Sequence, residues 1–273
     1  MITSWNLFLE KVGNIPLSNV DTYISGMNKS MNDKLFFVDK IKPDVIVDFG
    51  CADGTTLLNI KEKYPTIDLI GYDLDPDMVA QAKSKVKAEV TNNWGMVKSL
   101  LTKSEYQYPA LLLSSVIHEV YSYSNSNTIK KFWEEQVFGG LFKYIVIRDM
   151  IPSTVLQKED FLKFKEDAKK VNKKADKKRL FEFEKIWGLI DNDYRTFLHW
   201  LLKYTYTDNW EREVRENYLP LTIETLYKKI PSNYRVRFRD NFIFDPIQKR
   251  VMQDFGVKIL HNTHTKMIIE KLD

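Results

Sequence analysis

The sequence predicts an α/β protein with a doubly wound, mostly parallel sheet, a helical insertion and a terminal pair of antiparallel strands. Three observations predict this fold class. Between residues 41 and 149, five short apolar runs alternate with segments of helical spacing, as in a parallel sheet covered by helices. Residues 154–230 show helical patterns only. Two later segments, 234–244 and 264–272, alternate apolar and polar residues with the period of a strand.

Each element of the sheet region follows from its own residues. The run VIVDFG at 45–50 is apolar and β-branched and stops at a glycine, as a buried parallel strand does. Further strands are predicted at 67–73, 88–92, 110–117 and 144–149. Helices are predicted at 31–41, 55–64, 78–86, 95–103 and 128–137.

The chain contains no internal repeat and no Gly/Ser-rich linker, so its organisation is predicted from pattern alone. Residues 1–40 are expected to form an N-terminal helical cap, and residues 41–153 a ligand-binding core. Residues 154–230 form the helical insertion, and residues 231–273 supply the terminal strands that complete the sheet. This pattern favours one sheet domain with an insertion over two independent domains.

Composition narrows the classes of protein to which the chain can belong. Of its 273 residues, 41 are basic and 37 acidic, and a net charge of +4 does not by itself indicate a nucleic-acid-binding protein. A single cysteine excludes a disulfide framework and fits a reducing compartment. The first residues lack the pattern of a signal peptide, and no run approaches the ~20 apolar residues of a membrane span. We therefore expect a cytoplasmic protein without a membrane partner.

The most informative segment follows the first predicted strand and reads Asp48-Phe49-Gly50-Cys51-Ala52-Asp53-Gly54. A strand, a glycine-rich turn and a helix bring backbone N–H groups and the positive end of the helix beside a ligand. Ala52 and Thr55 break the G-x-G-x-x-G pattern of nicotinamide enzymes, and the Gly-Lys-Ser/Thr of a phosphate-binding loop is absent from the sequence. The remaining pattern, D-x-G-x-x-x-G, has an acidic residue that suits a positively charged ligand, such as an amine or a sulfonium.

This loop resembles the first motif of the class I S-adenosylmethionine-dependent methyltransferases, with Asp48, Gly50 and Gly54 in place and Ala52 instead of the middle glycine. Asp73, at the end of the second strand, matches the family's second motif, an acidic residue that binds the ribose hydroxyls. The resemblance covers roughly residues 41–150 and implies a methyltransferase with S-adenosylmethionine as cofactor and residues 41–153 as its Rossmann-like, cofactor-binding core. The residues predicted to bind the cofactor are Asp48, Gly50, Cys51, Ala52, Gly54, Asp73, Leu74, Asn92, Asn93 and Ser114.

Several residues in this region also have a structural interpretation. Cys51 is expected to be a small residue tolerated beside the cofactor rather than a nucleophile. Asp53 is expected to be a solvent-facing loop or cap residue. Asn92 or Asn93 falls where the family contacts the adenine, but a turn residue is equally compatible with that position.

In a doubly wound sheet the chemistry takes place beyond the carboxyl ends of the strands. The fourth predicted strand leads into His118 and Glu119. Because methyl transfer to a hydroxyl needs a base, His118 is predicted as the general base, with Glu119 as its orienting partner or as the alternative base. A histidine that only lines the site is the competing interpretation. Arg148, which ends the fifth strand, either pairs with Asp149 or binds an anionic acceptor.

Basic residues of the insertion form rows with helical spacing. Lys170, Lys174 and Lys178 lie four residues apart on one face of a predicted helix whose opposite face is apolar. Such a row is either a solvated face or a platform for phosphates. The second possibility favours RNA or another nucleic acid as the methyl acceptor, with O-methylation.

Other functions are kept as alternatives. The first is a methyltransferase with a small-molecule acceptor, and the second is a catalytically inactive methyltransferase-like module that binds nucleic acid or protein. A nicotinamide-dependent oxidoreductase is disfavoured by Ala52 and Thr55. No metal site is expected, because His261 and His264 should point to alternate faces of a strand without a further ligand nearby.

Overall fold

A computed structural model of the chain describes residues 31–103, 105–153 and 158–273. Most of the predicted N-terminal cap, 1–40, therefore lies outside the described residues. The helix predicted at 31–41 is short: α3 (Met31–Lys34) is followed by turns up to Lys40. The side chains of Leu35, Phe37 and Ile41 are buried against the sheet. A straight helix would not bury Leu35 and Phe37 together, because residues two positions apart lie on different faces of a helix.

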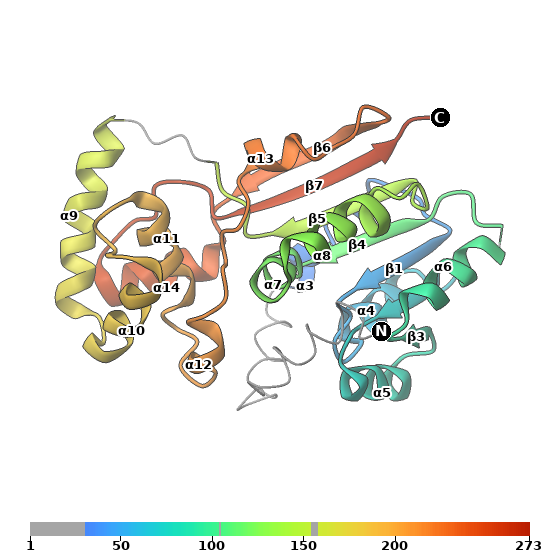
Figure 1. Cartoon of the computed structure of the whole chain (residues 1–273), viewed down its shortest axis with the longest axis horizontal. Coiled ribbons are helices and arrows are strands. Elements are labelled where there is room, and N and C mark those ends of the chain that lie inside the picture. Colours follow the sequence, from blue (N-terminus) through green and yellow to red (C-terminus); the bar gives the residue numbers. More distant parts are fainter. Residues whose placement is uncertain (1–30, 104, 154–157) are drawn as a thin grey trace.

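The described residues contain a seven-stranded sheet with the order β3-β2-β1-β4-β5-β7-β6 (Figure 1). The first five strands are parallel, whereas β7 is antiparallel to β5 and β6 is antiparallel to β7, so the predicted fold class is confirmed. The order reverses between β1 and β4, which is the point at which doubly wound sheets bind ligands. The strands are β1 (Val45–Phe49), β2 (Asp68–Tyr72), β3 (Glu89–Thr91), β4 (Ala110–Ser114), β5 (Tyr144–Asp149), β6 (Tyr234–Phe242) and β7 (His264–Lys271).

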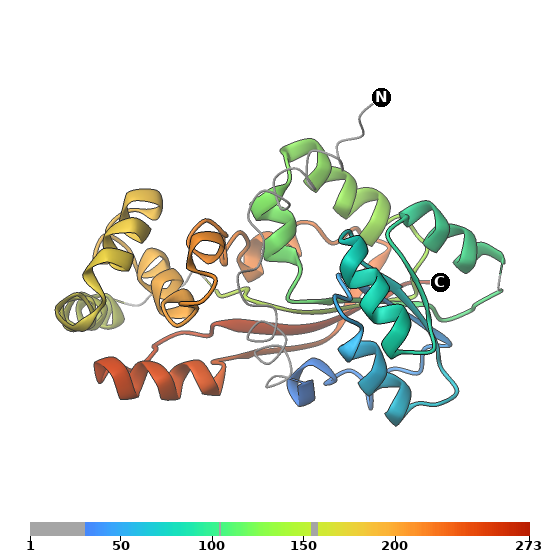
Figure 2. The same ribbon diagram turned by 90° about the horizontal axis from the view of Figure 1, so that it is seen from below.

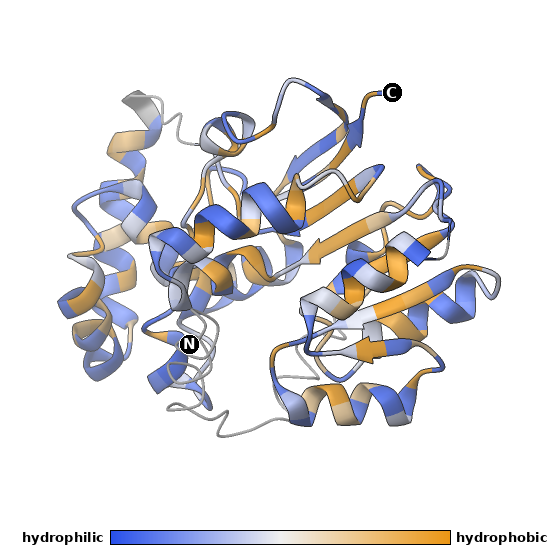
Figure 3. Ribbon diagram, turned by 45° about the vertical axis from the view of Figure 1, so that its right-hand side comes forward, coloured by the Kyte–Doolittle hydropathy of each residue, from blue (hydrophilic) through white to orange (hydrophobic). Residues whose placement is uncertain are grey.

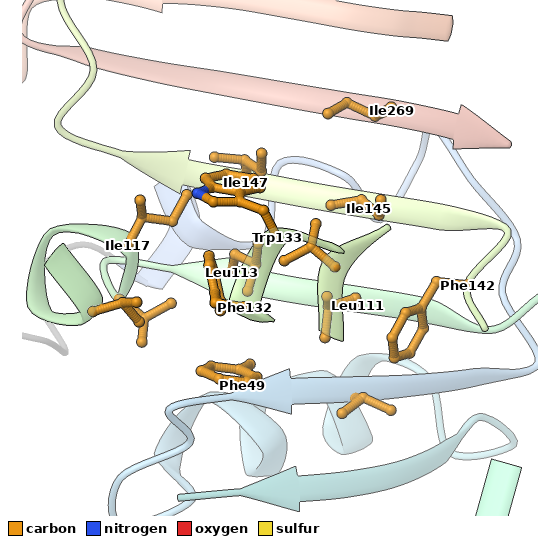
Figure 4. Close-up of a cluster of buried hydrophobic side chains, with 14 of the residues drawn as sticks. Phe49, Leu111, Leu113, Ile117, Phe132, Trp133, Phe142, Ile145, Ile147 and Ile269 are labelled. Atoms are coloured by element: carbon orange, nitrogen blue, oxygen red, sulfur yellow. The ribbon is translucent and has the colours of Figure 1, made fainter. Parts of the chain in front are cut away.

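Helices cover both faces of the sheet because alternate residues of each strand enter two separate apolar clusters. Val47 joins the cluster drawn in Figure 4, and its neighbour Ile46 joins the cluster on the other face. Since both faces are buried, the central strands are hydrophobic along their length, as Figure 3 shows. The face of Ile46 is covered by α3, α4 (Thr55–Lys63) and α5 (Pro76–Lys85). The face of Val47 is covered by α6 (Trp94–Lys103), α7 (Ile117–Tyr123), α8 (Ser126–Lys131) and the π-helical η1 (Phe132–Val137).

The structure differs from the predicted boundaries where β4 leaves the sheet. The strand predicted at 110–117 ends at Ser114, and α7 begins at Ile117. Ser115 has a φ of 58°, a left-handed conformation that no strand continues through. The sequence pattern missed this boundary because Val116 and Ile117 are buried in the same apolar cluster as Leu113 and therefore continue its apolar run.

The insertion folds into α9 (Lys158–Lys174), α10 (Lys177–Trp187), α11 (Tyr194–Lys203) and α12 (Trp210–Glu213), while α13 (Ile223–Tyr227) packs back against the sheet. An unexpected helix, α14 (Asp245–Phe255), occupies the connection between β6 and β7. Its Val251 and Phe255 belong to the apolar cluster of the insertion. We call α9–α12 with α14 the helical lobe, so residues 231–273 complete both the sheet and the lobe.

The helical lobe lies beyond the carboxyl ends of the parallel strands, whose arrows point toward it (Figures 1 and 2). α7 lies at this junction, and α9 lies at the end of the lobe that is farthest from the sheet (Figure 1). The junction is therefore where the sheet, α7 and the lobe can contribute side chains to one site. Within the described ranges, no helix combines the length and the apolar character needed to cross a membrane.

Candidate functional site

The loop after β1 takes its shape from three residues with positive φ: Gly50 at 77°, Ala52 at 45° and Gly54 at 79°. Glycine adopts such angles without steric cost, whereas alanine adopts them with some strain. A Cβ on Gly50 would lie 2.8 Å from Cγ2 of Val116, so this position is restricted by space as well as by conformation. The motif therefore favours glycine at alternate positions because the turn needs positive φ angles there, and Ala52 adopts the same kind of conformation.

Asp73 ties the second predicted motif to the first. Its Oδ2 accepts a 2.8 Å hydrogen bond from the backbone N–H of Ala52, and its Oδ1 accepts a 3.0 Å bond from the N–H of Asp75. Burial raises the pKa of Asp73, although these backbone N–H groups partly oppose the rise. The structure thus joins Asp73, from the second predicted motif, to Ala52, in the first.

The remaining loop residues have different environments. Cys51 is buried, and burial raises the pKa of its thiol, so it is a packing residue rather than a nucleophile. The expectation that Asp53 faces solvent was wrong: its side chain is buried, pairs with Lys85 and accepts a 2.8 Å hydrogen bond from Oγ1 of Thr55. It also accepts the backbone N–H of Thr55 at 3.1 Å, at the start of α4, although the N-cap residue of that helix is Gly54. Leu74 is half-buried against the cluster of Figure 4.

The two asparagines after β3 are both exposed but differ in their hydrogen bonds. Asn93 Oδ1 accepts the backbone N–H of Gly95 at 2.8 Å, which holds the first turn of α6. Asn92 is exposed beside it. Asn93 therefore has a structural function, and contact with the adenine stays a prediction for both residues.

Three predicted site residues lie at or near the carboxyl ends of strands and point to the face of the sheet that α3 covers. They are Asp48 on β1, Ser114 on β4 and Arg148 on β5. Each of them lies two residues after a strand residue that belongs to the apolar cluster on the α3 side of the sheet. Because strand side chains alternate between faces, residues two positions apart point to the same face. Arg148 is 4% exposed, and its Nε and Nη2 donate to Oδ2 of Asp33 at 3.0 and 2.9 Å. The predicted pairing of Arg148 with Asp149 is therefore wrong, because the guanidinium is bound to Asp33 and Asp149 pairs with His118. Binding of an anionic acceptor by Arg148 stays a prediction.

Asp149 pairs with His118 on the opposite face of the sheet. Nδ1 of His118 donates to Oδ1 of Asp149 at 2.9 Å, and the backbone N–H of Ile117 donates to Oδ2 at 2.7 Å. Burial alone would lower the pKa of His118, but the charge and the hydrogen bond of Asp149 outweigh it and raise the pKa to about 9. The predicted orienting partner, Glu119, is thus replaced by Asp149.

Glu119 instead faces a group of side chains from the helical lobe. Its Oε1 lies 3.7 Å from Nη2 of Arg212, whose Nε donates to Oε1 of Glu216 at 2.8 Å. The hydroxyl of Tyr123, on α7, donates to the same oxygen of Glu216 at 2.6 Å. Burial raises the pKa of Glu119 to about 7, against the opposing effect of Arg212.

A second group of side chains reaches the ring of His118 through Tyr218. The ring of Tyr218 meets it edge-on with centroids 5.3 Å apart, and the hydroxyl of Tyr218 donates to Glu213. Under Tyr218 lies the buried amine of Lys203, which donates to the backbone carbonyls of Glu213 and Glu216 at 2.7 and 2.6 Å. Burial lowers the pKa of this amine to about 7.

Sequence reasoning missed the contribution of residues 210–218. The available signal was the ion pair between Arg212 and Glu216 at i, i+4 in a segment that also carries tryptophan and tyrosine. Nothing in the local pattern indicates that this segment meets α7, which lies about ninety residues earlier. We call α7 together with residues 210–218 the acceptor junction, after the function that is proposed for it below.

The predicted basic row is interrupted in the structure. α9 ends at Lys174, Asp176 caps α10, and Lys178 belongs to that second helix, so the row does not continue along one helix. Nζ of Lys170 is 2.9 Å from Oδ1 of Asp167, an ion pair within α9. The apolar side of the predicted helix is confirmed, since Phe164, Ala168, Val171 and Ala175 are buried.

His261 and His264 do not share a ligand site. Nε2 of His261 lies 3.4 Å from Asp160, whereas His264 is buried with its Nδ1 2.8 Å from Oγ1 of Thr263. Among the residues that the structure describes, no group of three or more His, Cys, Asp or Glu side chains could hold a metal ion.

Comparison with known proteins gives one family and several similar structures. Residues 47–135 match the model of a family described as a methyltransferase domain. The chain is similar to the plantazolicin methyltransferase BamL crystallised with SAH (S-adenosylhomocysteine), with 10% identity, a TM-score of 0.44 and coverage of 99% of this chain and 90% of that one.

Two further solved structures have similar scores. The methyltransferase domain of bacterial CtHen1-C has 10% identity and a TM-score of 0.46, and 90% of this chain and 98% of that one are covered. A SAM-dependent methyltransferase from Archaeoglobus fulgidus has 14% identity and a TM-score of 0.43, with 91% and 100% covered. At such scores these structures carry no argument about the acceptor of this chain.

Proposed function

We propose that this chain is a class I S-adenosylmethionine-dependent methyltransferase that methylates a small-molecule acceptor without phosphate groups at its acceptor junction. The family and the cofactor follow from the methyltransferase domain at 47–135, the sheet order and the loop that joins Ala52 to Asp73. The identity of the acceptor and the functions of individual residues are the further part of this proposal.

This proposal rests on the acidic side chains of the acceptor junction. Glu119, Glu213 and Glu216 bring three buried or half-buried carboxylates from two chain segments to the surroundings of His118. The nearest cations are already paired, because His118 is bound to Asp149, Arg212 is shared by two of these carboxylates and Lys203 is bonded to backbone carbonyls. A phosphodiester at this place would meet carboxylates whose nearest cations are already paired, which disfavours its binding.

The basic residues lie away from this junction. Lys170 and Lys174 belong to α9, at the end of the lobe that is farthest from the sheet (Figure 1). A nucleic acid held there would have to extend across the lobe to bring a nucleotide to the carboxyl ends of the strands. This separation weakens the reason for expecting RNA as the acceptor.

The residues suggest how the chain assists methyl transfer. When bound, the cofactor supplies a methyl group on a sulfonium, which an oxygen or nitrogen nucleophile can displace. The chain has to hold the acceptor, exclude water and remove the acceptor's proton. Glu119 is suited to remove it, because its pKa of about 7 leaves a large fraction of carboxylate at neutral pH and still favours proton uptake.

His118 is suited to a different task. With a pKa of about 9 it already holds its proton at neutral pH, so it is a weak general base there. Its charge favours the ionised form of the neighbouring Glu119, and the bond to Asp149 fixes the orientation of the ring. We therefore assign the base to Glu119 and a charged positioning function to the pair of His118 and Asp149.

Transfer of a labelled methyl group tests the proposal. The purified protein is incubated with methyl-labelled S-adenosylmethionine and a cell extract that has been separated into small molecules, protein and RNA, with Asp73→Ala as the blank. We expect label in the small-molecule fraction. Nuclease-sensitive label in the RNA fraction would overturn the proposed acceptor. Intact S-adenosylhomocysteine binding with no transfer to any fraction would support an inactive binding module.

A further inference from the structure

Lys34 is a buried cation without a partner in the part of the chain that the structure describes. The side chain belongs to α3 and the residue is 3% exposed. Over the described ranges, its amine forms no hydrogen bond and no ion pair. A buried charge is costly unless it is paired, and the carboxylates that attract Lys34, chiefly Asp48, do so without a direct contact. The amine is therefore free to bind a further anion.

The surroundings of Lys34 place this amine at the ligand-binding edge of the sheet. The adjacent Asp33 binds Arg148, at the end of β5, and also pairs with Lys266, which fixes α3 over this edge. The charges that act on Lys34 include Arg148 from β5 and Asp48 from β1. β4 lies between those two strands, so the amine lies near the switch point of the strand order.

A second polar group on the same face also has no partner. Oγ of Ser114, at the end of β4, is shielded from solvent and forms no hydrogen bond with any described residue. Buried polar groups of this kind are normally satisfied by protein, water or ligand. The two groups come from different elements, α3 and β4, and both belong to the side of the sheet that carries Asp48.

The chemistry of the cofactor supplies an anion that fits this position. One end of S-adenosylmethionine is a nucleoside, which the family motif assigns to Asp73 beyond β2, and the other end is an amino acid with a carboxylate and an ammonium group. Because β1 lies between β2 and β4, a ligand that extends from Asp73 across β1 brings its amino-acid end toward Lys34. Asp48 is suited to the ammonium group by its charge, and Lys34 to the carboxylate.

We propose that Lys34 binds the carboxylate of the methionine part of S-adenosylmethionine and so fixes the sulfonium relative to the acceptor junction. This inference rests on the cofactor assignment of the proposed function but not on the identity of the acceptor. It adds α3, which lies before the recognised motifs, to the cofactor site.

Calorimetry with two ligands tests the inference. S-adenosylhomocysteine has the amino-acid end, whereas 5′-methylthioadenosine has the same nucleoside without it. Lys34→Met should weaken S-adenosylhomocysteine binding by roughly 10- to 100-fold, because a charge-assisted hydrogen bond is lost. Binding of 5′-methylthioadenosine should stay within about twofold, and Lys34→Arg should retain part of the lost affinity. Lys40→Met, in the turns after α3, is the matched control and should bind both ligands as the parent does.

Several outcomes would overturn the inference. Unchanged S-adenosylhomocysteine affinity in Lys34→Met would do so, as would an equal loss for both ligands, which indicates a purely structural function. If Lys34→Met does not fold, the parent protein decides the question: equal affinity for S-adenosylmethionine and its decarboxylated form would exclude a carboxylate site. Failure of the parent to bind any of these ligands would instead contradict the cofactor assignment, and the labelled-methyl assay reports on the acceptor separately.

Discussion

The cofactor side and the acceptor junction of this molecule are built in different ways. On the cofactor side, the turn from Gly50 to Gly54 and the bond between Ala52 and Asp73 rely on the backbone and on residues close together in the sequence. At the acceptor junction, side chains of α7 meet side chains of residues 210–218 through ion pairs and hydroxyl groups. A backbone site tolerates few substitutions and suits a constant ligand, whereas a side-chain site can change its specificity residue by residue.

The largest expected effect concerns the proposed base. Glu119→Gln should lower kcat by about 10²–10⁴ at pH 7, while calorimetry shows unchanged S-adenosylhomocysteine affinity. In the parent, kcat should rise with pH through about 7, because the carboxylate of Glu119 must be ionised. Glu211→Gln, an exposed carboxylate of α12, is the control and should behave as the parent does. A parent profile that rises through about pH 9 would assign the base to His118.

The next effect concerns the free energy of unfolding, whose dependence on pH is expected to come from the pair of His118 and Asp149 beside the junction and not from the cofactor side. The pKa of folded His118, about 9, lies above its ordinary value of 6.5. The protonated pair with Asp149 therefore stabilises the fold fully below pH 6.5, and this contribution is lost as the pH rises through 9. Urea unfolding at these two pH values should show a loss on the order of 2–4 kcal/mol in the parent that is absent in His118→Gln. The same pH dependence in both proteins would refute this assignment.

A smaller effect is expected on the cofactor side. Asp73→Ala removes the acidic acceptor for the ribose hydroxyls and should weaken S-adenosylhomocysteine binding by about ten- to a hundredfold. Asp75→Ala is the matched control, because that side chain caps α5 through the N–H of Asp77 at 2.8 Å. It should reduce thermal stability more than cofactor affinity. If calorimetry shows equal affinity in Asp73→Ala and the parent, the motif assignment is incorrect.

The smallest effect is expected from the basic residues. Replacement of Lys170, Lys174 and Lys178 by Gln should leave kcat/KM unchanged, because these side chains lie outside the acceptor junction. Filter binding should detect no RNA affinity that depends on them. If RNA does bind and the slope of log affinity against log salt falls by up to about two units in the variant, nucleic acid returns as the acceptor.

The sequence was sufficient for the sheet and for the proximity of the two predicted motifs because their signals are local. Asp48, Gly50 and Gly54 fall within seven residues, and Asp73 ends the next strand. The acceptor junction was not predictable in this way, since the contact between Tyr123 and Glu216 joins residues ninety-three positions apart. Such contacts depend on how the lobe packs, which no periodicity reports.

One error at the junction could have been avoided with strand geometry alone. Arg148 and Asp149 are adjacent in β5, and neighbouring strand residues point to opposite faces of a sheet. Their mutual pairing was therefore improbable from the start, and two separate partners had to exist. The structure supplies Asp33 on one face and His118 on the other.

The position of β7 has a consequence for synthesis on the ribosome. β7 follows β6 in the chain but lies between β5 and β6 in the sheet, and α14, made just before it, completes the apolar cluster of the lobe. Until residues 245–271 have emerged, the nascent chain exposes the open edge of β5 and the uncovered side of α11 together. Chains with such surfaces aggregate readily or require chaperones, so residues 245–271 protect the nascent chain from association as well as completing its fold.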